Sequence, residues 1–295
     1  MSKNKENSDI VSSIVGASYI GKPKNNTAMF VTKKIENQVL NLASANGCLV
    51  FCETGMNIPA EMYEKHHFIE TSQPQLEYAR FIIEYSEQKD MKDKTLRYTL
   101  TDGGYYLGED VIIGKNAYIQ PNCIIGHHVV IGDNAIILSG TKIQESCIGD
   151  NFYSNENAVI GANGFTMAKD EQGRVFRVPS LGKVMIGNDV EIGVMTNVSR
   201  GSAGDTILCN HVKLDAYTYV AHDVYIEDNV EIPAGAKLGG FVYIESGAFI
   251  GINASLRNRI HIGQNAVIGM GAVVTKSVEK DAVMVGNPAR PMEKR

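Results

Sequence analysis

The sequence predicts a mainly β chain, in which a solenoid of short parallel strands follows a small α/β domain. Two series of apolar residues at intervals of six predict the solenoid, and a helix–strand–helix pattern in the first hundred residues predicts the α/β domain. A period of six fits neither the 3.6-residue period of a helix nor the alternation of an ordinary sheet. We therefore expect two domains, over residues 1–100 and 101–295.

The repeat defines the second domain. The longer series has twelve members, Leu208, Leu214, Val220, Ile226, Ile232, Leu238, Ile244, Ile250, Leu256, Ile262, Ile268 and Val274. The shorter series has seven members, Leu107, Ile113, Ile119, Ile125, Ile131, Ile137 and Ile143. Three hexads would close one triangular coil of about 18 residues, and coils would stack at about the 4.8 Å spacing of strands. The large aliphatic residue of each hexad would point inward, with Gly or Asn where a turn needs a positive φ.

Two irregularities interrupt the count. The step from Ile143 to Ile148 is one residue short of a hexad, a deletion that a corner of the coil can absorb. The step from Ile160 to Ile186 is far longer than a hexad, because a polar segment near 163–183 is inserted. We expect this segment to leave the coil as a loop or hairpin. Such loops often carry binding function, although a surface insertion without a function fits the pattern as well.

The first domain shows helical and strand patterns. Residues 35–46 have apolar residues at helical spacing, and 48–52 form a short apolar strand. Ser72-Gln73-Pro74 begins a second helix, because it supplies a cap and an early proline. Its inner stripe consists of Leu76, Ala79, Ile82 and Ile83. The charged, turn-rich segment 87–104 predicts the linker between the domains.

Composition excludes several classes of protein. The chain has 28 Lys+Arg and 33 Asp+Glu, so its formal net charge is −5 and it lacks the basic excess of a nucleic-acid binder. No apolar run approaches the roughly 18 residues of a membrane span, and residues 1–10 lack the apolar core of a secretory signal. These features predict a cytoplasmic protein without a membrane span. The five cysteines fit no disulfide or zinc pattern, so we expect reduced thiols.

One histidine lies where a coil could carry chemistry. His222 follows the inward Val220 closely, and Gly240 lies three hexads after His222, at the equivalent position of the next coil. A neutral imidazole can accept a proton from an attacking amine or hydroxyl, and a free amide can stabilise an oxyanion. This pair predicts acyl transfer without a covalent enzyme intermediate. Asp223, the next residue in the sequence, is a candidate to orient the imidazole.

Several motifs surround His222. Residues 158–224 contain IGxxGF, PxxGxVxIGxxVEIG, an Arg200-Gly201 to Asp205-Thr206 stretch and AHxV. This segment resembles the UDP-3-O-acylglucosamine N-acyltransferases of lipid A synthesis. The resemblance implies a left-handed parallel β-helix and a homotrimer with active sites in clefts between subunits. It also implies that His222 is the general base, Asp215 a supporting carboxylate and Gly240 the oxyanion donor.

The resemblance extends to the first domain. TAMFVTKKIE, residues 27–36, looks like the uridine-binding segment of that family, which implies nucleotide recognition and a substrate contact at Phe30. Lys33 and Glu36 stand where the family has Asn and Tyr, and Arg259 stands where it has a second His associated with the substrate and acyl chain.

Charged and aromatic residues near the inserted segment are further candidates. Arg200 and Phe165 are expected to bind substrate, and Arg200 could contact a nucleotide diphosphate. Arg174 and Arg177 of the insertion are candidates for the same contact, whereas ordinary solvent exposure is the alternative for each.

The C-terminal segment departs from the lipid A family. Residues 271–276 and 285–291, which include a GNPA turn, resemble the ending of hexapeptide acetyltransferases that use acetyl-CoA. The resemblance implies that acyl-CoA is a co-substrate. The residues implied to hold it are Lys276, Gly286, Asn287, Pro288, Ala289 and Arg290. A turn that only closes the last coil is the alternative.

These observations predict an N-acyltransferase that transfers an acetyl or short acyl group from acyl-CoA to the amine of a nucleotide-linked amino sugar for surface polysaccharide. The alternative is a lipid A type enzyme that uses a hydroxyacyl carrier protein. We expect no permanently bound cofactor and no metal. A zinc enzyme of the hexapeptide type would need converging imidazoles, usually including an H-x4-H pair, whereas His211 and His222 are too far apart to form one.

Overall fold

The computed structural model describes residues 13–292, so the polar start of the chain lies outside the described residues. The chain divides into two compact units. Of the described residues, the first unit contains 13–93, 165–181 and 202–204, and the second contains 94–164, 182–201 and 205–292. Within the described part of the chain, no helix is long and apolar enough to cross a membrane.

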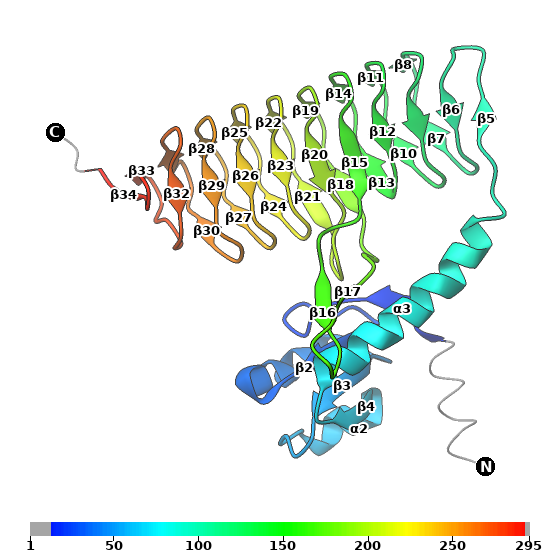
Figure 1. The fold of residues 1–295 in the computed structure, drawn as a ribbon, viewed down its shortest axis with the longest axis vertical. Coiled ribbons are helices and arrows are strands. Elements are labelled where there is room, and N and C mark those ends of the chain that lie inside the picture. The colour runs from blue at the N-terminus through cyan, green and yellow to red at the C-terminus, as the bar shows by residue number, and fades with distance from the viewer. Residues whose placement is uncertain (1–12, 293–295) are drawn as a thin grey trace. The chain divides into compact units, whose positions relative to one another are not determined.

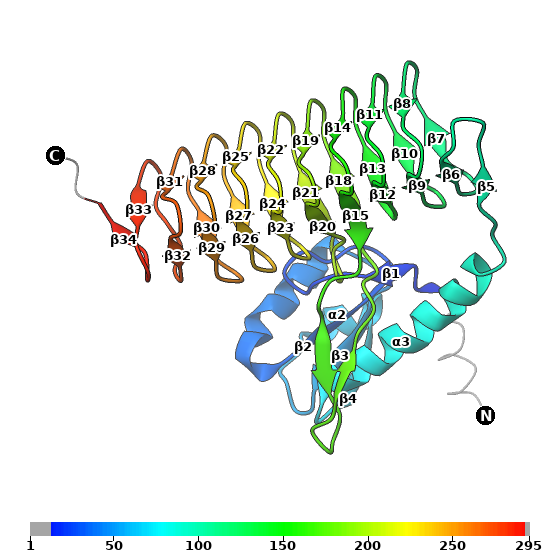
Figure 2. The same ribbon diagram turned by 45° about the horizontal axis from the view of Figure 1, so that its top comes forward.

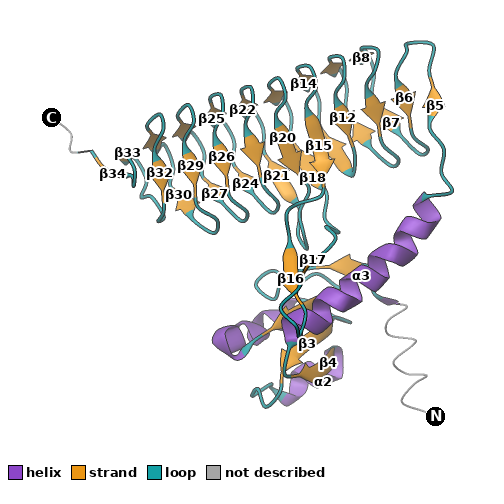
Figure 3. Ribbon diagram, viewed as in Figure 1, coloured by secondary structure: helices purple, strands orange, loops and turns teal. Residues whose placement is uncertain are grey.

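The first unit is built on a parallel sheet of four strands in the order β1-β2-β3-β4 (Figure 1). The strands are β1 (Gly16–Ala17), β2 (Thr27–Val31), β3 (Leu49–Glu53) and β4 (His67–Thr71). The helices are a 3₁₀ helix (Lys33–Ser44), α2 (Ala60–Lys65) and α3 (Pro74–Asp93), and Figure 3 colours them purple. This unit has the predicted α/β character.

The helices differ in detail from the prediction. The first is a 3₁₀ helix that buries Val39 and Leu42, and Ile35 near its start has non-helical backbone angles. Helix α3 begins at Pro74, as predicted. It continues to Asp93, so the linker predicted over 87–104 begins too early. Residues 87–93 contain no Gly or Pro and consist largely of Glu, Gln, Lys and Met, which favour helix.

The inserted segment forms a hairpin within the first unit. Its strands β16 (Met167–Lys169) and β17 (Val175–Arg177) pair antiparallel. Val178 and Ala203 are buried in one apolar cluster with Phe51 and Ile82. The insertion is therefore stabilised by packing within a hydrophobic core.

The second unit is a left-handed parallel β-helix, whose coils follow one another along its length in Figure 1 and Figure 2. Its three faces are three sheets. The first sheet contains β7 (Ile112–Ile113), β10 (Val130–Ile131), β13 (Ser146–Ile148), β18 (Val184–Ile186), β21 (Thr206–Leu208), β24 (Tyr225–Ile226), β27 (Tyr243–Ile244) and β30 (His261–Ile262). The second sheet contains β8 (Tyr118–Ile119), β11 (Ile136–Ile137), β14 (Tyr153–Ser154), β19 (Glu191–Ile192), β22 (Lys213–Leu214), β25 (Glu231–Ile232), β28 (Phe249–Ile250), β31 (Val267–Ile268), β33 (Val283–Val285) and β34 (Arg290–Pro291). The third sheet contains β5 (Thr99–Leu100), β6 (Tyr106–Leu107), β9 (Ile124–Ile125), β12 (Lys142–Ile143), β15 (Val159–Ala162), β20 (Asn197–Ser199), β23 (Tyr219–Val220), β26 (Lys237–Leu238), β29 (Ser255–Leu256) and β32 (Val273–Val274).

The register follows the predicted repeat. Val220 pairs with Leu238, its equivalent one coil later, and the inward aliphatic residues form one buried cluster. Ile131 pairs with Ile148, one residue short of a full coil, so the corner at Glu145, with φ of 43°, absorbs the deletion. Ile148 in turn pairs with Ile186, which shows that the insertion leaves the coil intact.

The corners confirm the expected use of Asn and Gly at positive φ, and other glycines have a second role. Asn residues occupy positions of positive φ, as at Asn116 and Asn134, which agrees with the prediction. Gly114 and Gly132, which follow inward isoleucines, do not have a positive φ. A Cβ at Gly114 would lie 2.4 Å from the carbonyl carbon of Gly132. Gly114 and Gly132 are therefore needed because adjacent coils approach closely, whereas Gly140 and Gly235 have the predicted positive φ.

Candidate active site

His222 lies at the corner between the third and first sheets. It falls between β23 and β24, and its neighbours Val220, Ala221 and Val224 are buried in the coil. The chain turns at this point, so the imidazole emerges beside the coil with its side chain 17% exposed. We call this edge of the β-helix, where the chain passes from the third sheet to the first, the His222 corner.

The imidazole of His222 is oriented by a buried carboxylate. Nδ1 of His222 lies 2.7 Å from Oδ2 of Asp223, whose side chain is 2% exposed. The amide of Asp223 donates to Oγ1 of Thr206, which fixes the corner. When Nδ1 donates to the carboxylate, the lone pair of a neutral imidazole is on Nε2. Among the described residues Nε2 of His222 has no hydrogen-bond partner, so this atom is available as a base.

Two glycines pack against the imidazole. A Cβ at Gly240 would lie 2.8 Å from Cε1 and 3.0 Å from Nε2 of His222. A Cβ at Gly164 would lie 2.7 Å from Cβ and 3.0 Å from Cδ2 of the same side chain. Both glycines are buried, and neither has a positive φ. They are therefore required by the space that the imidazole occupies.

Gly240 also presents a free donor. Among residues 13–292, its amide N–H has no hydrogen-bond acceptor, although the residue is buried. A buried N–H without an acceptor inside the chain can donate to an oxygen atom of a bound molecule. The N–H of Gly240 can therefore serve as the predicted oxyanion donor. Gly240 lies beside the edge of the imidazole that carries Nε2.

The structure places Asp215 at a different corner. Asp215 follows β22 and therefore lies between the second and third sheets, where its Oδ1 accepts from the amide of Ala216 at 2.6 Å. Asp223 is the carboxylate on Nδ1 of His222. Because each face of the prism takes one hexad, the sequence spacing of Asp215 and His222 separates them by one face.

Arg200, which was predicted to contact a phosphate, instead pairs with side chains of the chain itself. Its Nη1 pairs with Oε1 of Glu145 at 3.1 Å, its Nε donates to Asn163 at 3.1 Å, and the side chain is 13% exposed. The amide of Arg200 also donates to the carbonyl of Ala162. Arg200 therefore anchors the 162–164 segment, which ends at the Gly164 that packs on His222.

The candidate substrate residues of the first unit lie apart from one another. The ring of Phe30 packs against Tyr78, with centroids 5.3 Å apart, in an apolar cluster. Phe165 is 70% exposed, and Cζ of Arg177 lies 5.6 Å from the centre of its ring. A pocket in this unit is lined by residues 21–24, 40, 41, 43 and 44, and Phe30 is not among them.

The candidate CoA residues gather at the last coil. Gly286, Asn287, Pro288 and Ala289 form the turn between β33 and β34, and Arg290 follows in β34. Ala289 is buried, and its amide donates to the carbonyl of Val273. Lys276 is exposed and follows β32, so it lies at the His222 corner. The sequence signals thus converge on one end of the β-helix.

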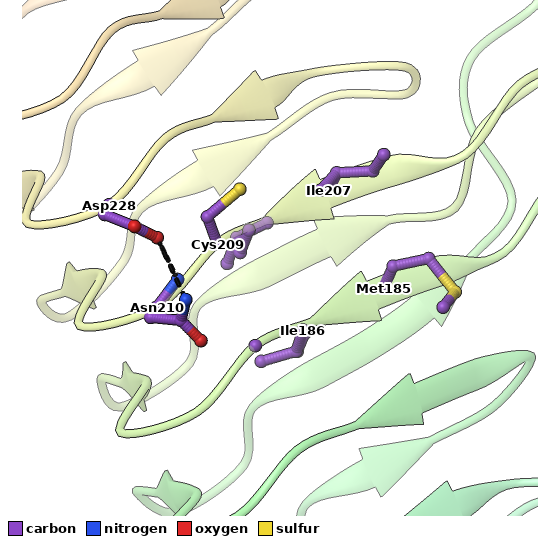
Figure 4. A pocket seen from close by; sticks show the side chains of 8 residues that line it. Met185, Ile186, Ile207, Cys209, Asn210 and Asp228 are labelled. Carbon is purple, nitrogen blue, oxygen red and sulfur yellow. Dashed lines mark hydrogen bonds between the residues drawn. The ribbon is translucent and has the colours of Figure 1, made fainter.

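A further pocket of about 430 Å³ lies on the first sheet and contains none of the predicted site residues (Figure 4). Met185 and Ile207 line it together with Cys209, and Asn210 donates to Asp228 at its edge. Within the described part of the chain, no group of three or more His, Cys, Asp or Glu residues is placed to hold a metal ion.

Comparison with known proteins agrees with the repeat. The bacterial transferase hexapeptide model, of six repeats, matches residues 104–138, 205–240 and 241–276. The UDP-N-acetylglucosamine acyltransferase from Bacteroides fragilis is a similar solved structure, with 26% identity, a TM-score of 0.59 and coverage of 65% of this chain and 73% of that one. The enzyme from Francisella novicida, at 24% identity and a TM-score of 0.59, covers 64% and 68% and shows the same fold. The chain therefore resembles hexapeptide-repeat proteins in its sequence and shares the β-helix fold of these structures.

Within this class the chain resembles UDP-3-O-acylglucosamine N-acyltransferases. The chain is 32% identical to the Coxiella burnetii enzyme over 159 residues. This match covers 45% of this chain and 46% of the relative. The chain is 38% identical over 124 residues to the Polynucleobacter asymbioticus enzyme, a match that covers 41% and 34%. The chain thus spans less than half the length of these curated relatives.

Proposed function

We propose that this protein is an N-acyltransferase that moves an acyl group from a thioester to the amine of a UDP-linked amino sugar. One observation carries the proposal. The His222 ring, oriented by the buried Asp223, packs with Nε2 against Gly240, whose amide N–H has no acceptor among the described residues. The names of the relatives, which act on UDP-sugars, support the class of acceptor.

The geometry supports a direct attack. The amine nitrogen bonds to the thioester carbonyl carbon while Nε2 of His222 removes a proton from that nitrogen. The carbonyl oxygen becomes an oxyanion and accepts from the N–H of Gly240. The carbonyl then re-forms, the C–S bond breaks, and the imidazolium returns its proton to the leaving thiolate. Asp223 stabilises the imidazolium during these steps, and the products are an amide and a free thiol.

The donor we propose is an acyl-CoA. Lys276 lies at the His222 corner three coils beyond His222, which is about 14 Å at the usual strand spacing. An extended donor along this corner would place its thioester at the imidazole and its phosphates toward Lys276 and Arg290. The names of the relatives favour a second candidate acceptor, UDP-3-O-acylglucosamine. The alternative donor that we propose with this acceptor is a hydroxyacyl carrier protein.

We also propose a homotrimer. Outward-facing residues of the first sheet form a row of apolar and aromatic side chains, one from each of several consecutive strands. The row contains Val130, Cys147, Met185, Ile207, Tyr225 and Tyr243. Such a continuous apolar face is typical of a surface that a partner covers. Light scattering of the purified protein should give three times the chain mass of 32.2 kDa, and a monomer would contradict this part of the proposal.

The activity is tested by following thiol release. The purified protein is incubated with acetyl-CoA, longer acyl-CoAs or acyl carrier protein thioesters, each with a panel of UDP- and dTDP-linked amino sugars. We expect amino-sugar-dependent release from an acyl-CoA and an amide product by mass spectrometry. Release only from carrier protein would replace the CoA assignment with the second candidate, and release from neither donor with any amino sugar would overturn the proposal.

A further inference from the structure

An exposed arginine lies one aromatic ring away from the imidazole. The Phe241 ring meets the His222 ring edge-on, with centroids 5.4 Å apart and planes at 90°. The guanidinium carbon of Arg259 lies 4.0 Å from the centroid of the same Phe241 ring. The amide of Arg259 donates to the carbonyl of Gly240 at 2.9 Å, so its backbone is fixed to the residue that supplies the predicted oxyanion donor.

The stack follows from the repeat. Asp223, Phe241 and Arg259 recur at intervals of one full coil, and they have nearly the same left-handed φ of 62°, 63° and 62°. They are the same corner position on three consecutive coils. The backbone therefore holds the carboxylate, the ring and the guanidinium in a column beside His222.

The guanidinium of Arg259 is free to bind an anion. The residue is exposed, and in the described part of the chain no ion pair includes it. Stacking on Phe241 occupies one face of the planar guanidinium but leaves its N–H edge unused. That edge matches the two oxygens of a phosphate, and such bidentate contacts are among the strongest hydrogen bonds in proteins. Arg200, in contrast, is committed to Glu145.

We propose that Arg259 binds the diphosphate of the acceptor nucleotide sugar and so determines its position beside His222. This inference rests on the proposed function. In a 2-amino sugar nucleotide the amine and the diphosphate are on adjacent ring carbons, so an amine at Nε2 brings the phosphate close to the imidazole. The phosphates of CoA, in contrast, are separated from the thioester by the whole pantetheine arm. A guanidinium one ring away from His222 therefore fits the acceptor better than the donor.

Calorimetric titration of the full chain tests the assignment. The probes are UDP-glucosamine, glucosamine 1-phosphate, glucosamine without a phosphate, and CoA. Each is titrated into the wild type and the variants R259Q and R259K. We expect R259Q to weaken binding of both phosphorylated sugars about 10- to 100-fold, R259K to lose less, and CoA affinity to stay within about twofold. The matched control is R97Q, which removes the same charge at the N-terminal end of the β-helix and should bind every probe as the wild type does.

Each other result overturns the assignment. If R259Q weakens CoA and spares the sugars, the guanidinium binds the phosphates of the donor. If R259Q binds all probes normally while the wild type binds and acylates UDP-glucosamine, Arg259 has no ligand role although the proposed function stands. If the wild type binds none of the sugars, the proposed function fails and this inference fails with it. Equal melting temperatures of wild type and R259Q would exclude misfolding as the cause of a loss.

Discussion

Replacement of Gly240 by alanine tests the site at its tightest contact. The new Cβ would lie 2.8 Å from Cε1 of His222, whereas an ordinary contact begins at 3.4 Å, so the imidazole must move by several tenths of an ångström. Because the 2.7 Å bond to Asp223 holds the ring, this movement disturbs the orientation of Nε2. The backbone conformation of Gly240 suits alanine, and the N–H remains present. The expected effect is therefore on the position of the base.

A displacement of about 1 Å in a catalytic group can cost about 100-fold in rate. We therefore expect G240A to lower kcat about 10- to 100-fold, and to lower the free energy of unfolding by about 1 kcal/mol through overpacking. Steady-state thiol-release assays measure the first quantity, and chemical denaturation measures the second. The control is G16A, because a Cβ at Gly16 has no heavy atom within 4 Å and its φ is not left-handed. Wild-type kcat in a folded G240A protein would refute the arrangement described for His222.

Three further predictions follow from the contacts of named side chains. H222A should lower kcat about 10²- to 10⁴-fold in steady-state assays and should still bind CoA in calorimetric titration. D223N should lower kcat while leaving KM nearly unchanged in the same assays. R200Q removes the ion pair with Glu145 and loosens the segment that packs on His222. We therefore expect lower kcat and a lower melting temperature, both partly rescued by R200K. Burial lowers the pKa of His66, whose Nδ1 accepts from an amide while Nε2 donates to a carbonyl. The folded state therefore binds this proton more weakly, so the melting temperature of the first unit should fall as the pH drops below about 6.5, and less so in H66Q.

The β-helix could be predicted from the sequence because each core position is repeated. Many inward aliphatic residues repeat the same six-residue period. One deletion and one long insertion therefore do not obscure the period. The pairing of His222 with Gly240 follows from the same arithmetic, since equivalent positions on adjacent coils are neighbours. Helix α3 is less regular. The residues at its end favour helix, but their high charge is equally typical of a linker, so the predicted boundary came too early.

Contacts that depend on side-chain direction could not be predicted. The choice between Asp215 and Asp223 depends on the corner at which each lies and on the left-handed backbone at 223, neither of which the repeat specifies. Arg200 and Glu145 are distant in the sequence and are separated by the insertion, so no periodicity connects them. The prediction that Arg200 contacts a phosphate therefore did not foresee its ion pair with Glu145.

The corners of the β-helix divide structural and functional tasks. At the corner between the first and second sheets, side-chain oxygens of Asp133, Asp150, Asn188, Asn210 and Asp228 each accept from a backbone amide of the preceding coil. That ladder satisfies the turn amides and stabilises the stack. At the His222 corner the equivalent place on one coil is Gly240, whose amide is left unpaired among the described residues. By the rule of the ladder the acceptor would be the side chain of Asn258, one coil later, but among the described residues no hydrogen bond joins the two. A side chain at position 240 itself would occupy the space of the imidazole, so this coil combines a glycine with a free donor. Because the same edge also carries Gly164, Arg259 and Lys276, substitutions along it should change activity and specificity, whereas substitutions along the ladder should change stability alone.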